Sequence, residues 1–314
     1  MRFRTFTQAI YLQYRAAFDR TPAAILSLML VAIAFAILAA EQRSRGRARC
    51  YRSGAGAARD LPAVPLGRWR WAALALSAAV VGLALALPAG VLAYLLVRGL
   101  AAGIPFNLTA GAAANSVLVS AAGATVALLL ALPVAALAAR HPGRGADAVE
   151  RVAYAGYALP GLVVGLAFVF FASRYTAAFY QSLPLVVAAY VVLFLPQVAK
   201  PLKSGLLQLN PRVEEAGRTL GRGPGAVFRR VVLPLLARPA AAGMALVLTA
   251  MKELPATLLL RPTGFETLAT RIWTSASAGL YSRAAVPALL IVLVSAIPLS
   301  ALARRVGVEE VRGD

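Results

Sequence analysis

Residues 214–236 read EEAGRTLGRGPGAVFRRVVLPLL and interrupt a chain whose other segments are mostly apolar. Charged residues and glycines are interspersed in this insert, which ends with a short apolar run. The 314 residues are 60% hydrophobic and 14% charged, with a mean hydropathy of +0.74. This composition is typical of an integral membrane protein. The charged insert is therefore expected to lie outside the bilayer core, between two membrane spans.

Seven apolar runs approach the length of about 20 residues that a helix needs to cross a bilayer core. A spanning strand would instead show about ten residues of strict alternation, which these runs lack. We therefore predict an all-α integral membrane protein with about seven transmembrane helices. The expected spans are residues 22–40, 71–96, 112–139, 152–172, 184–199, 237–255 and 285–302.

Lysine and arginine are distributed unevenly among the loops. The segments 41–70, 140–151 and 200–238, together with the tail after residue 302, hold 22 of them, whereas the alternate loops hold five. Because basic residues resist translocation, we expect the first set in the cytoplasm, with the insert and the C-terminus. The same bias accounts for the net charge of +20, so nucleic acid is not an expected partner.

The insert is predicted to form two short helices joined by a glycine corner. Asn210 can cap the first helix, Pro211 suits its first position, and Gly221 ends it. Pro224 begins the second helix, and Pro234 marks the entry to the next span.

One side of the first predicted helix carries Val213, Ala216 and Leu220, which are spaced as neighbours on a helical face. Such a face fits a groove in a partner protein, or it lies on the lipid surface. The residues alone leave both interpretations open.

The insert places EAG at 215–217, a glycine at 221 and VVLP at 231–234. This pattern resembles the coupling motif of permease subunits from binding-protein-dependent ATP-binding cassette (ABC) importers, written EAA, three residues, G, nine residues, I-x-L-P. Two positions depart: Gly217 should loosen its helical turn by up to about 1 kcal/mol, and Val231 replaces the isoleucine. The resemblance implies contact with an ATPase through Glu214, Glu215, Ala216, Gly217, Leu220, Gly221, Val231, Leu233 and Pro234.

The resemblance extends over residues 111–305. It implies that six of the seven helices form an importer-type permease half with a cytoplasmic coupling loop at 205–236. The stretch KELPATLLLRPTGFETLATRIW, Lys252–Trp273, looks most like the ferric-iron branch of these permeases, which are commonly fused proteins with two such halves.

The first 21 residues carry four arginines on the side predicted to be outside, against the charge rule. An offset of 263 aligns Thr7, Phe18, Arg20 and Leu26 with Thr270, Tyr281, Arg283 and Leu289. Because transporters are often built of repeated halves, we predict that residues 1–45 are the last helix of a preceding permease half. The remaining divisions are a cytoplasmic linker at 46–70, an accessory helix and outer loop at 71–110, the transmembrane domain at 111–305 and a cytoplasmic tail at 306–314.

None of the three lysines follows a glycine, so the chain has no GxxxxGK[ST] phosphate loop. The resemblance implies a non-catalytic permease of the bacterial inner membrane that binds no cofactor itself, while a partner uses ATP. The implied partners are an ABC ATPase dimer, a periplasmic substrate-binding protein, a second permease half (a missing upstream half or another copy) and membrane lipid.

Lys252 and Glu253 stand near the outer end of the sixth expected span, where ionisable residues are candidates for function. Either Glu253 lines the pathway, where a carboxylate suits a hard cation such as ferric ion, or it pairs with an arginine while Lys252 extends to the headgroups. Pro160 and Gly161 are candidates for a kink beside the pathway. No cluster of acidic residues or histidines indicates a metal cage.

Ferric iron is thus the predicted cargo. Thiamine, a polyamine or a phosphonate remain alternatives, because related permeases share the motif and the binding protein largely selects the substrate. A non-transporting membrane scaffold also remains open. An intramembrane hydrolase is not expected, since His141 lies in a loop and no aspartate lies in an expected span.

Overall fold

The computed structural model describes residues 5–16, 21–44, 66–104, 109–141 and 143–311, and every regular element within these ranges is a helix. The all-α prediction is therefore confirmed. The elements before the insert are α1 (Phe6–Ala16), α2 (Thr21–Ser44), α3 (Trp69–Ala101), α4 (Ala110–Arg140), α5 (Arg144–Tyr154), the 3-10 turn η1 (Ala155–Tyr157), α6 (Gly161–Tyr175), the 3-10 turn η2 (Ala177–Phe179) and α7 (Leu183–Gln208).

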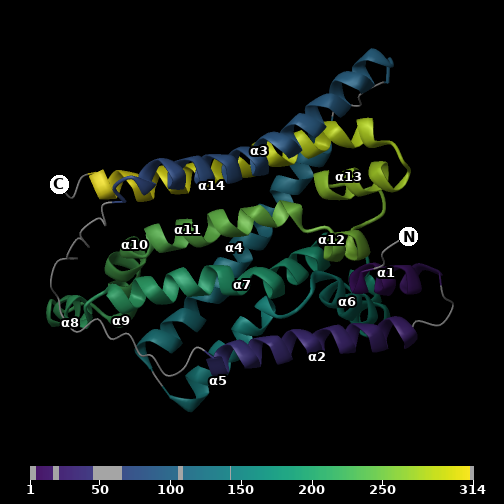
Figure 1. The fold of residues 1–314 in the computed structure, drawn as a ribbon. Coiled ribbons are helices and arrows are strands. Elements are labelled where there is room, and N and C mark those ends of the chain that lie inside the picture. The colour runs from purple at the N-terminus through teal and green to yellow at the C-terminus, as the bar shows by residue number, and fades with distance from the viewer. Residues whose placement is uncertain (1–4, 17–20, 45–65, 105–108, 142, 312–314) are drawn as a thin grey trace.

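The insert and the segments after it form a second series of helices. They are α8 (Pro211–Thr219), α9 (Pro224–Val227), the π-helix η3 (Phe228–Val232), α10 (Leu233–Leu235), α11 (Ala237–Leu248), the 3-10 turn η4 (Thr249–Lys252), α12 (Pro255–Leu260), α13 (Leu268–Ser277) and α14 (Tyr281–Val311). Figure 1 shows the axes of α2, α7, α11 and α14 roughly aligned, with α8 at one end of the bundle and α12 and α13 at the other.

Five of the described helices are long and apolar enough to cross a membrane alone. They are Thr21–Ala40, Trp69–Ala101, Ala110–Arg140, Leu183–Gln208 and Tyr281–Pro298. Two bent helix pairs raise the number to seven if each pair crosses as a unit, which agrees with the seven spans predicted from hydropathy.

The span expected at 152–172 is not one continuous helix. The chain bends by 107° between Arg144–Tyr157 and Gly161–Tyr175. Pro160 lies at the bend and has an extended backbone (φ −63°, ψ 135°). The preceding helix ends here because a proline has no N–H to continue the helical hydrogen bonds and disfavours helical geometry in the residue before it. The bend falls at Pro160 and Gly161, the candidates for a kink, and their position beside a pathway stays a prediction.

The span expected at 237–255 is also divided. Helix α11 ends at Leu248, the turn η4 follows, and Glu253 is extended (φ −68°, ψ 110°) before Pro255 begins α12. Here, too, a proline lies at the break, in this case as the first residue of α12. Each break leaves the start of a new helix inside the bundle.

Helix α7 is longer than the expected span at 184–199, because it continues through Pro196 and Pro201 to Gln208. Pro196 cannot donate to the carbonyl of Val192, four residues earlier. Gly156 of η1 packs directly against that carbonyl, in space that any side chain at 156 would fill. The neighbouring element therefore covers the unpaired group, and α7 remains a single helix.

The centre of the bundle is the contact between α4 and α7, with α11 packed on both. One face of α4 presents small residues to this contact: Ala124, Ala127, Ala131 and Ala135, all buried. Small side chains let helices in a membrane approach closely, which strengthens their packing.

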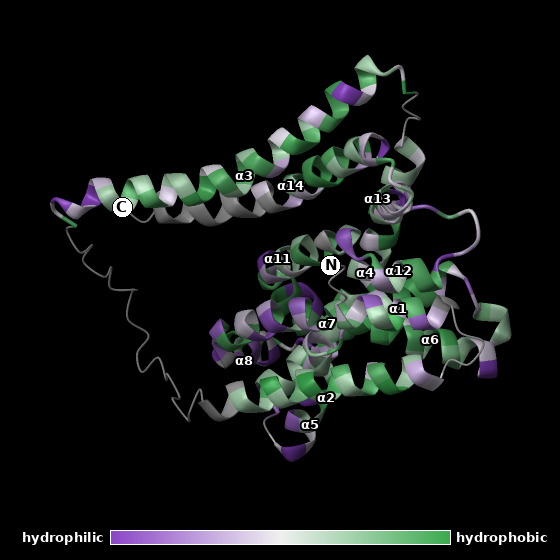
Figure 2. Cartoon of the chain, turned by 45° about the vertical axis from the view of Figure 1, so that its right-hand side comes forward, coloured by the Kyte–Doolittle hydropathy of each residue, from purple (hydrophilic) through white to green (hydrophobic). Residues whose placement is uncertain are grey.

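Helix α3 lies along α14 and is exposed over almost its whole surface, with Gly99 as its only buried residue. Figure 2 shows that α2 and α3 are hydrophobic along their length, whereas hydrophilic residues gather on α5 and α8. A helix that is apolar on all sides is typical of a membrane environment. The linker at 46–65 and the loop at 105–108 lie outside the described residues, and α14 continues into the expected tail as far as Val311.

Helices α1 and α2 form a short helix followed by a long one, as α13 and α14 do. The offset of 263 places the start of α1 one residue after the start of α13 and the start of α2 three residues after that of α14. The rings of Tyr11 and Trp273 make an edge-on contact, with centroids 5.9 Å apart, so that α1 touches α13. Sequence repeat and helix pattern therefore agree over these two pairs.

Candidate functional site

Helix α8 is built as the sequence predicts. Asn210 is extended and its side-chain oxygen accepts a hydrogen bond from the N–H of Arg212 (3.0 Å), while Pro211 takes the first helical position. Gly221 has a φ of +77°, a left-handed conformation that favours glycine. The predicted N-cap and glycine corner are confirmed.

The second helix of the insert runs from Pro224 to Leu235 and contains a π turn, η3. The turn immediately precedes Leu233 and Pro234. In a regular α-helix, the ring of Pro234 would crowd the carbonyl of Arg230, and the wider π turn relieves this clash.

Gly217, which departs from the coupling motif, has a packing role that the sequence did not reveal. It is buried, and a Cβ atom there would lie only 3.0 Å from Cγ2 of Val227. The missing side chain therefore lets α8 lie against α9. The expectation that Gly217 merely loosens its turn is incomplete, since the glycine also permits this close contact.

The outer face of α8 is open. Val213, Glu215, Ala216 and Leu220 are all exposed, and Leu220 is 80% accessible. In the second helix, Val231 is half-buried, while Leu233 and Pro234 are exposed. An apolar row beside a carboxylate is thus free to contact a partner protein.

Glu214 points the other way, toward α4. Its Oε1 accepts a hydrogen bond from Nη2 of Arg140, the last residue of α4, at 2.6 Å. The same guanidinium also donates to the carbonyl of Leu209, just before α8 (3.4 Å). Both side chains are about four-fifths shielded from solvent, at 20% and 22% exposed. The two neighbouring glutamates therefore have different surroundings.

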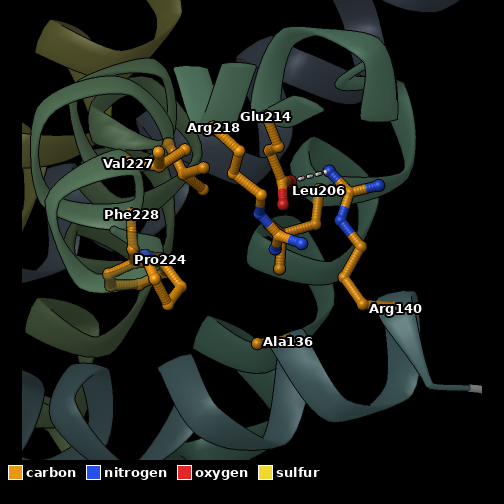
Figure 3. Close-up of a pocket in the computed structure, with 9 residues that line it drawn as sticks. Ala136, Arg140, Leu206, Glu214, Arg218, Pro224, Val227 and Phe228 are labelled. Carbon is orange, nitrogen blue, oxygen red and sulfur yellow. Dashed lines mark hydrogen bonds and ion pairs between the residues drawn. The ribbon is translucent and has the colours of Figure 1, made fainter. Parts of the chain in front are cut away.

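A cavity of about 150 Å³ lies behind this ion pair, between α4, α7 and the insert. Figure 3 shows Arg218 extending toward it and the Arg140–Glu214 bond at its edge. The lining residues are Ala136, Arg140, Leu206, Glu214, Arg218, Pro224, Val227, Phe228 and Val232. Most of this lining is apolar, so the ion pair is the main polar connection across the space.

Glu253 forms a second polar position, where the two broken spans meet. Its Oε1 accepts a hydrogen bond from the N–H of Ala256 at the start of α12 (3.3 Å). Its carboxylate also packs against Gly161, at the start of α6. No arginine pairs with Glu253 among the described ion pairs, so the alternative of such a pair finds no support there.

The candidate pathway residues are brought together only in part. Gly161 touches Glu253, and Pro160 directly precedes it, whereas the side chain of Lys252 is exposed. Two unexpected residues complete the corner: Thr257 Oγ1 donates to the Glu253 carbonyl (2.7 Å), and the Tyr190 hydroxyl bonds Thr257 Oγ1 (2.7 Å). Tyr190 and Thr257 are fully buried.

Within the described residues, no group of three or more histidine, cysteine, aspartate or glutamate side chains is placed to hold a metal ion. A single carboxylate, half-buried and held by one hydrogen bond, can meet a passing cation but offers no cage for it. The described residues therefore present a single half-buried carboxylate at one corner and an exposed helical face on α8.

Residues 131–308, which include both the insert and the Glu253 corner, match the family described as "Binding-protein-dependent transport system inner membrane component". The chain belongs to this family. It is therefore a permease-type inner-membrane component of this family, and several of its described helices are long and apolar enough to cross a membrane.

This permease is 34% identical over 304 residues to the Fe(3+)-transport system permease protein FbpB 2 of Haemophilus influenzae, a match that covers 95% of this chain and 60% of that protein. It is 29% identical over 209 residues to a putative 2-aminoethylphosphonate transport system permease protein, PhnV, of Salmonella typhimurium, covering 64% of this chain and 79% of that one. The permease thus spans about 60% of the length of its iron-transport relative.

The fold of the permease is similar to that of a solved chain from a bacterial alginate ABC transporter, with a TM-score of 0.58, 16% identity and coverage of 76% of this chain and 95% of that one. At that identity the likeness concerns the fold alone. It agrees with the helical bundle and its insert.

Sequence reasoning missed Arg140, Tyr190 and Thr257. In the sequence, Arg140 is one of several basic residues in a predicted loop. Its position at the end of a predicted span is the signal that it could reach the insert. Tyr190 is visible as a polar group within an apolar span, and such groups usually find a partner. The identity of that partner depends on how α7 and α12 pack.

Proposed function

We propose that this permease forms the translocation path for ferric iron. The observation that carries the proposal is the 34% identity with the Fe(3+)-transport permease over 95% of this chain. A phosphonate is the second candidate, supported by the PhnV relative, whose match is lower in identity and covers 64% of the chain. Both cargoes are used by the same class of permease.

In this proposal, Glu253 contributes to the path together with Pro160 and Gly161. Ferric iron is a hard cation that prefers carboxylate oxygen. One oxygen of Glu253 is held by Ala256, and no hydrogen bond to the other is found within the described part of the chain. A single carboxylate oxygen without a hydrogen bond can bind a cation weakly and release it again, which a translocation path requires. Lys252, exposed beside it, adds a positive charge that limits how long a cation stays.

The outer face of α8 is proposed to sit in a cleft of an ABC ATPase dimer, which uses the ATP. Glu215 and the apolar row of Val213, Ala216 and Leu220 are exposed and support this role. A short helix that presents an apolar face fits a groove in a partner. A periplasmic binding protein is proposed to deliver the cargo at the opposite end.

The α8 end of the bundle is proposed to face the cytoplasm. The loops with 22 basic residues include the insert and the segment after α4, and the end of α14 lies at the same end of the bundle as α8 (Figure 1). Basic loops stay on the cytoplasmic side. This orientation places the C-terminus in the cytoplasm and Glu253 nearer the outer side.

A second permease half is proposed to complete the path, with α1 and α2 as its last helices. The offset of 263 pairs Ile291 of α14 with Leu28 of α2. Ile291 is 8% exposed because it packs on its own half, whereas Leu28 is 68% exposed. If α2 belongs to another half, the helices of that half cover Leu28.

Transport measurements in membrane vesicles test the cargo. The permease is produced with its ATPase, binding protein and any upstream half, and ATP-dependent uptake of radiolabelled ferric iron and of 2-aminoethylphosphonate is compared. Iron uptake that falls at least tenfold in Glu253→Gln, with ATPase binding retained, supports the proposal; Glu266→Gln, an exposed carboxylate paired with Arg271, serves as control. Uptake of phosphonate alone would replace ferric iron as the cargo. A complex that assembles but carries neither would leave the scaffold interpretation.

A further inference from the structure

We propose that the ion pair between Arg140 and Glu214 is a direct link through which movement of α8 reaches the end of α4, and that Arg140 is therefore a positioning residue for transport. The inference rests on the proposed seating of α8 in an ATPase. The proposed link lies on the side of α8 that faces α4, whereas the proposed ATPase contact lies on the exposed side.

The contacts of α8 lead to this residue. Helix α8 packs on α9 and η3, which follow it in the chain, through Gly217 and Val227. Toward α4, a cavity of about 150 Å³ separates the elements, and the Arg140 guanidinium bridges its edge to Glu214 and to the carbonyl of Leu209. A displacement of α8 therefore acts on the end of α4 directly through this side chain, besides acting on α7, which precedes α8 by two residues and packs along α4.

Helix α4 is suited to carry this displacement inward. It packs on α7 along its alanine face, and Gly123 lies so close to Tyr190 that a Cβ atom at position 123 would be 3.1 Å from the tyrosine Cβ. The Tyr190 hydroxyl bonds Thr257, whose hydroxyl bonds the carbonyl of Glu253. A shift of α4 thus acts directly on the corner proposed to meet the cargo.

The two charges are well placed to act as a mechanical link. The distance of 2.6 Å is that of a charge-assisted hydrogen bond, and partial burial reduces screening by salt. Surface pairs contribute little, but a shielded, hydrogen-bonded pair is costly to separate. The Nε atom of Arg140 has no hydrogen-bond partner within the described structure, so the guanidinium bonds only two groups there: the Glu214 carboxylate of α8 and the carbonyl of Leu209, which caps the end of α7.

The test uses the assembled complex in vesicles and measures ATPase binding, binding-protein-stimulated ATP hydrolysis and cargo uptake. Arg140→Gln, Glu214→Gln and the exchanged pair Arg140→Glu with Glu214→Arg are compared with the native complex. The matched control is Lys203→Gln, which removes a similar pair with Glu150 that joins α7 to α5 and does not touch α8. Thermal unfolding of each complex identifies variants that merely fail to fold.

We expect Arg140→Gln to bind the ATPase and hydrolyse ATP while uptake per ATP falls about tenfold, Glu214→Gln to lower uptake per ATP by a similar factor, and the exchanged pair to recover much of that loss. Lys203→Gln should leave uptake per ATP unchanged. Equal uptake per ATP in all variants, or equal loss in the control, would overturn the inference while leaving the permease function intact. Loss of ATPase binding in Arg140→Gln would also overturn it, since the residue would then act at the docking face. A native complex that binds no ATPase contradicts the proposed function itself.

Discussion

The carboxylate of Glu253 occupies the space that a side chain at position 161 would take. The first residue of α6 and the residue before α12 are thereby in direct contact, although they are far apart in the sequence. The absence of a side chain at Gly161 is what allows the two broken spans to meet around a polar group.

Replacing Gly161 with alanine is expected to push the Glu253 carboxylate away and to separate α6 from α12. We predict a lower thermal unfolding midpoint and at least a tenfold loss of cargo uptake. The matched control is Gly82→Ala in α3, where a new methyl group meets no atom within 4 Å and alanine favours the helix. Equal behaviour of the two variants would contradict the contact.

The hydroxyl pair of Tyr190 and Thr257 predicts an order of stability. Thr257 donates its one hydrogen to the Glu253 carbonyl, so Tyr190 is the donor to Thr257. Tyr190→Phe removes one hydrogen bond and should lower the free energy of unfolding by about 1 kcal/mol. Thr257→Val leaves the buried tyrosine hydroxyl without a partner and should lower it by about 1 to 3 kcal/mol. Unfolding midpoints should therefore rank native, Tyr190→Phe, Thr257→Val. Adding Tyr190→Phe to Thr257→Val should cost little more, and a fully additive loss would refute the pairing.

Gly221→Ala is expected to strain the corner of the insert. An alanine with a φ of +77° costs about 1 to 2 kcal/mol relative to glycine. If relaxation of the corner displaces α8, affinity for the ATPase falls by up to about tenfold, because 1.4 kcal/mol corresponds to a factor of ten. Titration of the ATPase onto immobilised permease measures this. Gly223→Ala, with an ordinary φ of −66° and no atom within 4 Å of the new methyl group, should bind normally.

Gly217→Ala restores the residue type of the coupling motif but is expected to weaken the packing of α8 on α9. The new methyl group would lie 3.0 Å from Val227, closer than carbon atoms normally approach. Val227→Ala should relieve the crowding, so the double variant should bind the ATPase better than Gly217→Ala alone. Equal binding of both variants would show that α8 tolerates the shift.

Hydropathy located the spans because a helix in lipid must be apolar over its whole crossing length, and this information lies in consecutive residues. It did not locate the 107° bend at Pro160 or the end of α7 at Gln208. The average hydropathy of a window contains no information on where the backbone bends or where a helix continues beyond the apolar residues. Local rules succeeded for Asn210 and Gly221 because caps and left-handed turns are decided within a few residues.

The partners of the functional residues were harder to predict. Glu214 and Glu215 are adjacent and chemically identical, yet one pairs with Arg140 and the other is exposed. Which of them faces inward depends on the rotation of α8 against α4. That rotation is set by tertiary contacts such as Gly217 on Val227, which no local pattern encodes.

The closure of Gly156 over the Val192 carbonyl has a consequence for the electrical insulation of the membrane. A proline inside a membrane helix frees a carbonyl that attracts water, and a thread of water through a bundle conducts protons. Because the backbone of Gly156 packs against the Val192 carbonyl, it leaves no space for a water molecule at that carbonyl beside Pro196. Helix α7 can thus keep Pro196 within the membrane without opening a route for protons beside it.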